Sequence, residues 1–295
     1  MVRVTEWLGK RGISYAENVS GSRLTTFGSG GAVSVVARPK NEKALSDTID
    51  FLVDSGGSYR VLGGGSNVLL SDDGYDGVII RTDRLGDLGI KGTVLTVGAG
   101  VRLPVFSRKC AAIGLSGAEF AEGIPGTVGG AVYMNASAFG SGISDVLGSV
   151  RVLLGGRIET IPASALSMQY HRGGLPAGAV LLSATFHLAR GDREGIAERM
   201  RAFRARRAST QPKEPSAGSV FARGGDLPAA VFIEKTGLKG TRIGGAEISR
   251  KHCNFIVDMG GATTTEYYTL AERVRREVKE VTGVSLEYEV EFIQC

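Results

Sequence analysis

The sequence predicts an α+β protein built from two or three small units. Short β-rich runs alternate with single amphipathic helices, glycines cluster directly after predicted strands, and no long series of regularly alternating strands and helices runs through the chain. The length of 295 residues suits about two domains, because a domain usually has roughly 100 to 200 residues. A single doubly wound sheet is therefore not expected.

The first predicted unit combines one helix with several strands. Residues 32–38 form an apolar run typical of a strand, and residues 41–55 carry apolar side chains at helical spacing after Asn41, a residue suited to cap a helix. Short strands are expected at 59–62 and 77–81, on either side of a glycine-rich turn.

The second predicted unit is richer in strands. We expect one helix over 102–113. The strand candidates are 94–97, 149–154, 157–161 and 179–188.

An arginine-rich segment, residues 194–208, follows, with an apolar stripe at Ile196, Met200 and Phe203. We interpret it as a helix with a solvated face that leads into a linker. After this segment, a third block ends with a helix over 265–282 and a strand over 284–293.

Composition and charge limit the classes of partner. The hydrophobic content of 42% and charged content of 22% are ordinary for a globular protein. The net charge of +5 and the isoelectric point of about 9.1 favour an anionic partner. Nucleic acid is the weakest candidate, because aromatic residues are few and do not interleave with basic ones.

The cysteines predict neither a disulfide framework nor a metal site. Cys110, Cys253 and Cys295 are odd in number and form no C-x-x-C pair. The sequence shows no signal peptide, and no apolar run approaches the roughly 20 residues of a membrane span. We expect a cytoplasmic, soluble protein that holds no metal.

The first glycine cluster has the layout of a phosphate cradle. Three glycines at 63–65 follow the strand at 59–62, so consecutive N–H groups can form a concave anion site, and Ser66 and Asn67 add side-chain donors. A Rossmann fingerprint is excluded because Val68 stands where its third glycine belongs, and no Lys-Ser/Thr follows as in a Walker A loop. A plain hairpin turn would need fewer glycines.

A second glycine-rich stretch runs from residue 117 to residue 136. Its central part, residues 123–131, which we name the second glycine cluster, reads Gly-Ile-Pro-Gly-Thr-Val-Gly-Gly-Ala. Its glycines can bring backbone donors close to a pyrophosphate or a flat ring, while Pro125 fixes the approach. Taken alone, the pattern fits equally well a buried turn that packs two strands together.

The two clusters together resemble the flavin-binding domain of the UDP-N-acetylenolpyruvoylglucosamine reductases, the UDP-N-acetylmuramate dehydrogenases of peptidoglycan precursor synthesis. The resemblance covers nearly the whole chain, and the short interval between Tyr170 and Ser219 is similar to that of the shorter subtype of the family. Further matching segments are 25–31, 215–221, 233–240, 252–257 and 286–290.

The resemblance implies a two-lobed flavin domain like that of vanillyl-alcohol oxidase and a C-terminal α+β substrate-binding domain. Lobe 1 would be 1–83 joined by a strand at 284–295, lobe 2 would be 84–208, and the substrate domain 209–283. The implied FAD-binding residues are Leu62, Gly63, Gly64, Gly65, Ser66, Asn67, Val68, Leu69, Gly123, Ile124, Pro125, Gly126, Thr127, Gly129, Gly130 and Ala131.

The implied reaction reduces the enolpyruvyl group of UDP-N-acetylglucosamine enolpyruvate to a lactyl ether. NADPH would be the reductant, flavin N5 would deliver hydride, and Ser219 matches the family's general acid. A loop serine that merely caps a turn is the ordinary alternative. The expected partner is a small sugar nucleotide, without nucleic acid or membrane, and a monomer is expected.

Glu289 matches the catalytic glutamate of the family. Strict alternation in 286–292 places three glutamates on one face, so the pattern alone does not separate Glu289 from Glu287 or Glu291. The family usually has proline where Tyr288 stands and often a basic residue at 291, so the local electrostatics are expected to differ.

The family's carboxylate-binding arginine is harder to place. It follows a tyrosine, and here Tyr170 is followed by His171 and then by Arg172. We favour Arg172, because its charge is permanent and an adjustment of the backbone at Gly173-Gly174 would bring it round. His171 is the second choice, and an ordinary surface arginine is the third.

The remaining candidate substrate contacts are assigned by the type of side chain. Tyr170, His171, Arg223 and Asn254 are substrate candidates; Arg223 would replace the lysine that the family has at Ala222. By charge alone, three further cations could contact the diphosphate: Lys239, Arg242 and Lys251.

Two other classes remain open. The chain could be another FAD-dependent oxidoreductase of the same architecture, such as an alcohol or hydroxy-acid oxidase, or a non-catalytic nucleotide- or nucleic-acid-binding protein. The second is favoured only by the positive charge and by the arginine cluster at 199–207.

Overall fold

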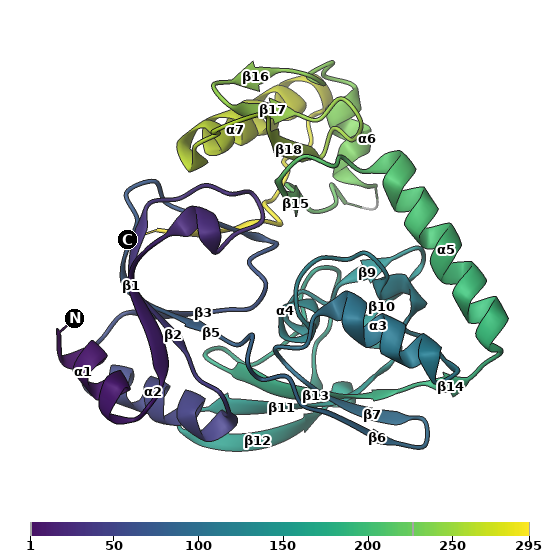
Figure 1. The fold of residues 1–295 in the computed structure, drawn as a ribbon. Coiled ribbons are helices and arrows are strands. Elements are labelled where there is room, and N and C mark those ends of the chain that lie inside the picture. Colours follow the sequence, from purple (N-terminus) through teal and green to yellow (C-terminus); the bar gives the residue numbers. More distant parts are fainter. Residues whose placement is uncertain (1, 226, 295) are drawn as a thin grey trace. The chain divides into compact units, whose positions relative to one another are not determined.

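The computed structural model describes residues 2–225 and 227–294 (Figure 1). The chain divides into two compact units and crosses between them several times. Unit 1 comprises 1–16, 35–64 and 77–207; unit 2 comprises 17–34, 65–76 and 208–295. Cys295, one of the three cysteines considered above, lies outside the described residues, and both Cys110 and Cys253 are buried free thiols.

The helices predicted from the sequence are present with bounds that differ by at most two residues. Asn41 caps α2 by accepting a hydrogen bond from the Ala44 N–H at 2.8 Å. The helices are α1 (Val2–Lys10), α2 (Glu42–Asp54), α3 (Leu103–Ala112), α4 (Val128–Tyr133), α5 (Arg193–Thr210), α6 (Ala229–Glu234) and α7 (Thr264–Thr282).

Unit 1 is centred on an antiparallel sheet of order β12-β11-β13-β7-β6. Helix α4 packs on β13 and β7, and α3 packs beside α4 (Figure 1). The core between them includes Phe106, Val128 and Phe186. The strands are β6 (Leu88–Lys91), β7 (Val94–Gly98), β11 (Leu147–Leu154), β12 (Arg157–Pro162) and β13 (Val180–His187).

A second core of unit 1 joins α1 and α2 to neighbouring strands, with Leu8, Leu45 and Ile80 fully or nearly fully buried. One sheet has the order β1-β2-β5-β3, and β3 pairs with β5 in parallel. Its strands are β1 (Ser14–Ser20), β2 (Ala32–Arg38), β3 (Tyr59–Leu62) and β5 (Tyr75–Arg81). Two short pairs are β8 (Leu115–Ser116) with β14 (Ala189–Arg190), and β9 (Ser137–Ala138) with β10 (Ser141–Gly142).

In unit 2, α7 packs on β17 and β16 of an antiparallel sheet of order β15-β18-β17-β16, and α6 packs against α7. Tyr267 of α7 is completely buried, in edge contact with Phe27. Strand β19 pairs in parallel with β4. The strands are β4 (Val68–Leu70), β15 (Ser216–Ser219), β16 (Arg242–Ile243), β17 (Ala246–Ile248), β18 (Phe255–Asp258) and β19 (Glu291–Ile293).

The strand predicted over 284–293 is wrong for most of its length. Only Glu291–Ile293 form β19, and before it a single isolated bridge joins Tyr288 to Phe221. The alternating pattern is real, because Leu286 and Val290 are buried in the core. It reflects alternate burial of an extended segment, which does not require a partner strand.

The mixture of helices with mainly antiparallel sheets confirms the α+β class. Among the described residues, the helices include none that is long and apolar enough to cross a bilayer. Likewise, residues 2–225 and 227–294 contain no cluster of three His, Cys, Asp or Glu side chains suited to a metal ion.

Candidate active site

In unit 1 the two glycine clusters pack backbone against backbone. A Cβ on Gly63 would lie 2.5 Å from the Thr127 Oγ1, and a Cβ on Gly64 would lie 2.6 Å from the Gly126 Cα. Neither approach tolerates a side chain, so glycine is required on steric grounds. The structure thus brings together two segments that the sequence separates by about sixty residues, and both were predicted to bind FAD.

Within the second cluster the glycines have different tasks. Gly129 donates to the Ala99 carbonyl at 2.8 Å, and a Cβ there would lie 3.0 Å from the Ala99 Cβ, so this glycine packs α4 against the end of β7. Thr127 caps α4 by accepting from the Gly130 N–H. Gly126, with φ of +107°, turns the loop before the helix. The packing role that the pattern left open therefore applies to Gly129.

The first cluster continues into unit 2 at Gly65. Its φ is +67°, a Cβ would collide with the Leu24 carbonyl, and its own carbonyl accepts from the Thr26 N–H at 3.0 Å. Ser66, Asn67 and β4 follow in unit 2.

Ser219 ends β15 directly after a break in the strand register. Ser216 pairs with Val257 and Ser219 with Phe255, so two residues of β15 face one residue of β18. Gly218 has a φ of +80°, and a Cβ there would lie 3.8 Å from the Ser66 carbonyl oxygen. Bulges of this kind re-aim the side chain that follows them. The half-buried Ser219 is thereby placed next to the loop that follows the three glycines.

Glu289 joins the same arrangement through the backbone. Its N–H donates to the carbonyl of Val220, the residue after Ser219, at 2.9 Å. Its carbonyl accepts from the Asn67 Nδ2 at 2.9 Å, and the Asn67 carbonyl accepts from the Glu291 N–H. The predicted proton donor, the predicted catalytic glutamate and the end of the first glycine loop therefore share one hydrogen-bonded region of unit 2.

Burial separates Glu289 from the neighbouring glutamates, which the alternating pattern could not do. Glu287 and Glu291 are exposed, whereas Glu289 is half-buried. Desolvation by burial raises the pKa of Glu289 from 4.5 to about 8. Its carboxyl group therefore carries a proton in most molecules at neutral pH and can act as a hydrogen-bond donor.

Asn254 lies in this region, but its side chain is used internally. Its Oδ1 accepts from the Phe221 N–H at 3.0 Å, its Nδ2 donates to the Phe221 carbonyl at 2.8 Å, and its own carbonyl accepts from the Val220 N–H. These bonds fix the chain directly after Ser219. Contact between Asn254 and substrate stays a prediction.

The segment predicted to bind the substrate carboxylate is a tight hairpin in unit 1. Gln169 and Arg172 exchange backbone hydrogen bonds, which leaves Tyr170 and His171 at the tip with their rings in edge contact. His171 has a φ of +55°. Arg172 is exposed.

The backbone directly after Arg172 packs against α4. Gly173 donates to the Tyr133 carbonyl at 2.8 Å, and a Cβ on Gly173 would collide with the Val132 carbonyl. The adjustment at Gly173-Gly174 that would bring Arg172 round stays a prediction. The choice between Arg172 and His171 stays open.

Three cations suggested as diphosphate contacts have partners within unit 2. Lys239 is paired with Glu234 at 2.6 Å, the Arg242 Nε donates to the Gly244 carbonyl, and the Lys251 Nζ donates to the Ala208 carbonyl. Arg223 is exposed, directly after Ala222. Their contacts with substrate stay predictions.

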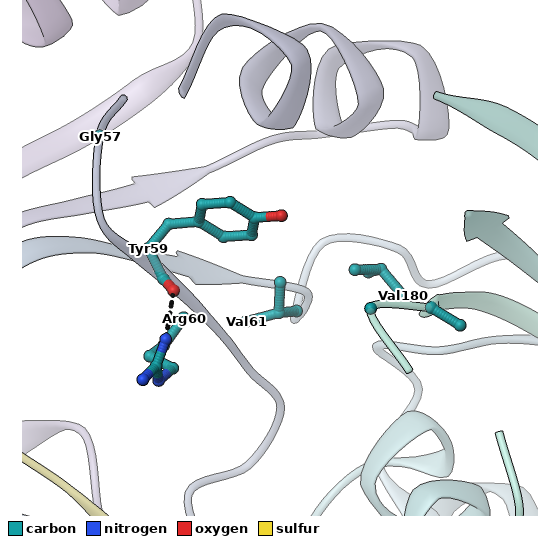
Figure 2. A pocket seen from close by; sticks show the side chains of 7 residues that line it. Gly57, Tyr59, Arg60, Val61 and Val180 are labelled. Atoms are coloured by element: carbon teal, nitrogen blue, oxygen red, sulfur yellow. Dashed lines mark hydrogen bonds between the residues drawn. The ribbon is translucent and has the colours of Figure 1, made fainter. Parts of the chain in front are cut away.

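A cavity of about 420 Å³ lies beside β3 in unit 1 (Figure 2). Tyr59 and Arg60 leave β3 on opposite sides, and the Tyr59 ring extends over Val61 toward Val180 (Figure 2). Its lining contains no predicted site residue, although β3 leads into the first glycine cluster. The lining residues are Gly57, Tyr59, Arg60, Val61, Gly178, Ala179 and Val180.

Sequence reasoning missed several residues that hold the site. Glu119 and Glu122 precede the second glycine cluster and pair with arginines of α5. Asn135 is buried with a φ of +44°, and its Nδ2 donates to the Gln169 carbonyl at 2.9 Å at the base of the hairpin. The two glutamates stood close to the glycine loop in the sequence, which was the available signal. Their partners lie some eighty residues away along the chain.

Comparisons with known proteins find matches over most of the chain. Residues 33–160 match the family model of an FAD binding domain, and residues 211–293 match that of the UDP-N-acetylenolpyruvoylglucosamine reductase C-terminal domain. The reductase of Rubrobacter xylanophilus is 41% identical over 92% of both chains. The reductase of Caldicellulosiruptor bescii is 40% identical over 97% of this chain and 93% of its own.

Solved structures show the same fold. The crystal structure of UDP-N-acetylenolpyruvylglucosamine reductase from Thermus caldophilus has a TM-score of 0.83 and 33% identity, covering 96% of this chain and 99% of that one. The glucooligosaccharide oxidase of Acremonium strictum has a TM-score of 0.51 at 14% identity, covering 97% of this chain and 59% of that one, which extends the likeness of fold to flavin oxidases.

Proposed function

Because this chain belongs to the family of UDP-N-acetylenolpyruvoylglucosamine reductases, we propose that it reduces the enolpyruvyl group of UDP-N-acetylglucosamine enolpyruvate to a lactyl ether, giving UDP-N-acetylmuramate. It is an FAD-dependent oxidoreductase that uses NADPH and acts on a sugar nucleotide in peptidoglycan precursor synthesis. The observation that carries the assignment of residues is the hydrogen-bonded region of unit 2, which joins Asn67 to Glu289 and Glu289 to the residue after Ser219.

The glycine clusters fit FAD. The glycines of residues 62–69 and 123–131 carry no side chains, and bare main chain is what a pyrophosphate and a flat ring require at close range. When bound, FAD accepts two electrons from NADPH and passes them to the substrate. The protein's part is to hold the substrate, to supply a proton and to stabilise developing charge.

Ser219 is the proposed proton donor. A hydroxyl group is a weak acid, but it donates adequately to a strongly basic carbon when it is held within hydrogen-bond distance. The bulge at Gly218 and the bonds of Asn254 to Phe221 fix the backbone on both sides of Ser219. This fixation lowers the cost of orienting the hydroxyl group for each turnover.

Glu289 and Arg172 are proposed to stabilise the charge that develops on the substrate. The raised pKa of Glu289 keeps its carboxyl group protonated, so it can donate a hydrogen bond without repelling an anion. Arg172 would pair with the substrate carboxylate, with His171 as the second choice. Tyr170, Arg223 and Asn254 remain proposed to contact or orient the substrate.

The proton donor is tested by separating the two half-reactions. NADPH should bleach the flavin of Ser219→Ala at the wild-type rate, whereas recolouring by the enolpyruvyl sugar nucleotide should slow by about 10²-fold or more. Ser216→Ala, on the same strand, serves as the control and should behave as wild type. Normal recolouring of Ser219→Ala would refute the role, and recolouring of the wild type by oxygen alone would favour an oxidase.

The carboxylate partner is tested by two single variants. We expect Arg172→Ala to raise the KM for the sugar nucleotide, while His171→Ala leaves it near the wild-type value. Impairment of His171→Ala alone would transfer the role to that residue.

We also propose the wider setting of the enzyme. It would act as a monomer in the cytoplasm, without nucleic acid or membrane, where NADPH and nucleotide sugars are available. The buried free thiols of Cys110 and Cys253 suit a reducing compartment. The proposed domains are a flavin lobe at 1–83 completed by 284–295, a second flavin lobe at 84–208 and a substrate domain at 209–283.

A further inference from the structure

Helix α5 contacts the segment that leads into the second glycine cluster. We name this segment, residues 117–126, the flavin loop. Gly117, Gly123 and Gly126 have φ values of +116°, +78° and +107°, so the loop contains three positions that only glycine adopts readily. Such a loop has many alternative conformations in isolation, and contacts from elsewhere must select one of them.

Two carboxylates of the loop are held by arginines of α5. The Arg199 Nη2 donates to the Glu119 Oε1 at 2.7 Å, and the Arg204 Nη2 and Nε donate to the Glu122 Oε1 at 2.8 and 3.1 Å. Arg108 of α3 approaches the other oxygen of Glu122, at 3.8 Å. Each carboxylate lies next to glycines of the loop, so each pair fixes a flexible stretch.

Glu119 is anchored on both sides. Besides Arg199, it accepts from the Gly117 N–H at 2.6 Å and from the Ser116 Oγ at 2.8 Å. The donors on Glu119 outweigh its burial, so the pKa of this carboxyl is held below its usual value and the group stays charged. The arginine therefore fixes the backbone at Gly117 through the carboxylate.

Arg207, near the end of α5, makes a third contact with the flavin loop. The Arg207 Cδ lies 3.0 Å from where a Cβ on Gly123 would be, and the Arg207 guanidinium is stacked over the Phe139 ring at 5.4 Å. Phe139 is itself stacked on Phe203 of α5, with ring centroids 4.3 Å apart. Contacts to Glu119, Glu122 and Gly123 thus follow the flavin loop in order.

We propose that α5 is a brace for the flavin loop, so that Arg199 and Arg204 are positioning residues for FAD. The inference rests on the proposed binding of FAD by residues 123–131. The sequence predicted a solvated helix face, which describes α5 only in part. The side chains of Arg199 and Arg204 are 50% and 62% exposed, whereas those of their partners Glu119 and Glu122 are 8% and 5% exposed.

Because the arginines are exposed and the glutamates are buried, removing the arginine of a pair should have a larger effect than removing the charge of its glutamate. In Arg204→Met, the buried Glu122 loses its main partner and cannot be hydrated, whereas in Glu122→Gln the arginine returns to water. Arg204→Met should therefore disturb the loop more than Glu122→Gln. The double variant should resemble Glu122→Gln, because the stranded charge is gone.

The test measures the release of FAD from the holoenzyme on dilution, followed by the rise in flavin fluorescence. We expect release to be at least tenfold faster in Arg199→Met and Arg204→Met, and less affected in Glu122→Gln. Arg201→Met is the matched control, since Arg201 is exposed on the same helix, and it should release FAD at the wild-type rate. The visible absorption bands of bound FAD should shift in the two affected variants only.

Several results would overturn the proposal. Wild-type release in both Arg199→Met and Arg204→Met would do so, even if their melting temperatures fell, because the pairs would then serve stability alone. Equal effects in Arg201→Met, or a double variant worse than Arg204→Met, would also contradict it. The assay needs no sugar nucleotide, so a wild type that holds FAD but does not reduce that substrate refutes the proposed function and leaves this test intact.

Discussion

Two glutamates, Glu119 in unit 1 and Glu289 in unit 2, are both desolvated by burial, and yet their pKa values shift in opposite directions. Glu119 of unit 1 receives donors from Arg199, Gly117 and Ser116, and its pKa is lowered despite burial. In Glu289 of unit 2, burial raises the pKa to about 8. The same side chain is thus a fixed anion in the first place and a proton-bearing acid in the second.

The difference in pKa follows from the surroundings of each carboxyl group. A buried anion is tolerated only where several donors replace the lost water. Glu119 has such donors and connects α5 to the flavin loop. The backbone of Glu289 is held through Val220 and Asn67, and desolvation of its carboxyl group raises the pKa. We infer that the first arrangement serves structure and the second serves chemistry.

The largest effect is expected from removing the acid of unit 2. Glu289→Gln should slow recolouring by the sugar nucleotide by about 10²- to 10³-fold, because the amide is a weaker hydrogen-bond donor to developing negative charge than the protonated carboxyl group. Stopped-flow absorbance after reduction by NADPH measures this directly. Glu287→Gln, two residues earlier and exposed, is the control; an equal loss there would remove the distinction between the glutamates.

Removing the arginine of unit 1 should instead cost stability. Arg199→Met leaves the buried Glu119 charge without its main donor and should lower the free energy of unfolding by about 3 kcal/mol at pH 7. Glu119 has a lowered pKa, so its favourable contribution is present above its ordinary pKa and is lost as the pH falls through the folded value. Denaturant unfolding should accordingly show the variant approaching the wild type in acid. A cost that does not change with pH would contradict this explanation.

Glu289 should give a pH dependence of stability with the opposite sign. Its pKa is raised on folding, so its contribution is complete below the ordinary value of 4.5 and is lost as the pH rises through about 8. Relative to the wild type, Glu289→Gln should therefore gain about 4 kcal/mol between pH 5 and pH 9. Both proteins are compared in denaturant titrations at saturating FAD. A constant difference would show that the carboxyl group is ionised throughout.

The smallest effect is expected at Asn67. Asn67→Ala removes the 2.9 Å hydrogen bond to the Glu289 carbonyl, which should cost about 1 kcal/mol of unfolding free energy. Because this bond positions Glu289, we expect kcat to fall by a larger factor than the loss of folded enzyme accounts for. A variant with wild-type turnover would show that the remaining backbone bonds position the acid sufficiently.

The sequence predicted well those features that depend on local pattern. The helix cap at Asn41, the strand over 32–38 and the glycine clusters are all present. Local pattern was insufficient where burial decides the outcome. The alternation in 286–292 could not distinguish Glu289 from its neighbours, because a periodicity of two reports which side chains share a face and not how deeply each lies.

The sequence also did not predict contacts between residues that lie far apart along the chain. The arginines of α5 appeared as a solvated face because their carboxylate partners lie about eighty residues earlier in the chain. The packing of Gly173 against α4, directly after Arg172, was likewise not predicted. In both cases a residue far away in the sequence determines what the local pattern can do.

Infrared difference spectroscopy of the FAD-bound enzyme during a pH titration tests most directly whether Glu289 holds a proton at neutral pH. The account predicts a carbonyl stretching band of a protonated carboxyl group at pH 7 that disappears around pH 8 and is absent from Glu289→Gln. A spectrum in which the wild type and this variant do not differ in that band at pH 6 would contradict it.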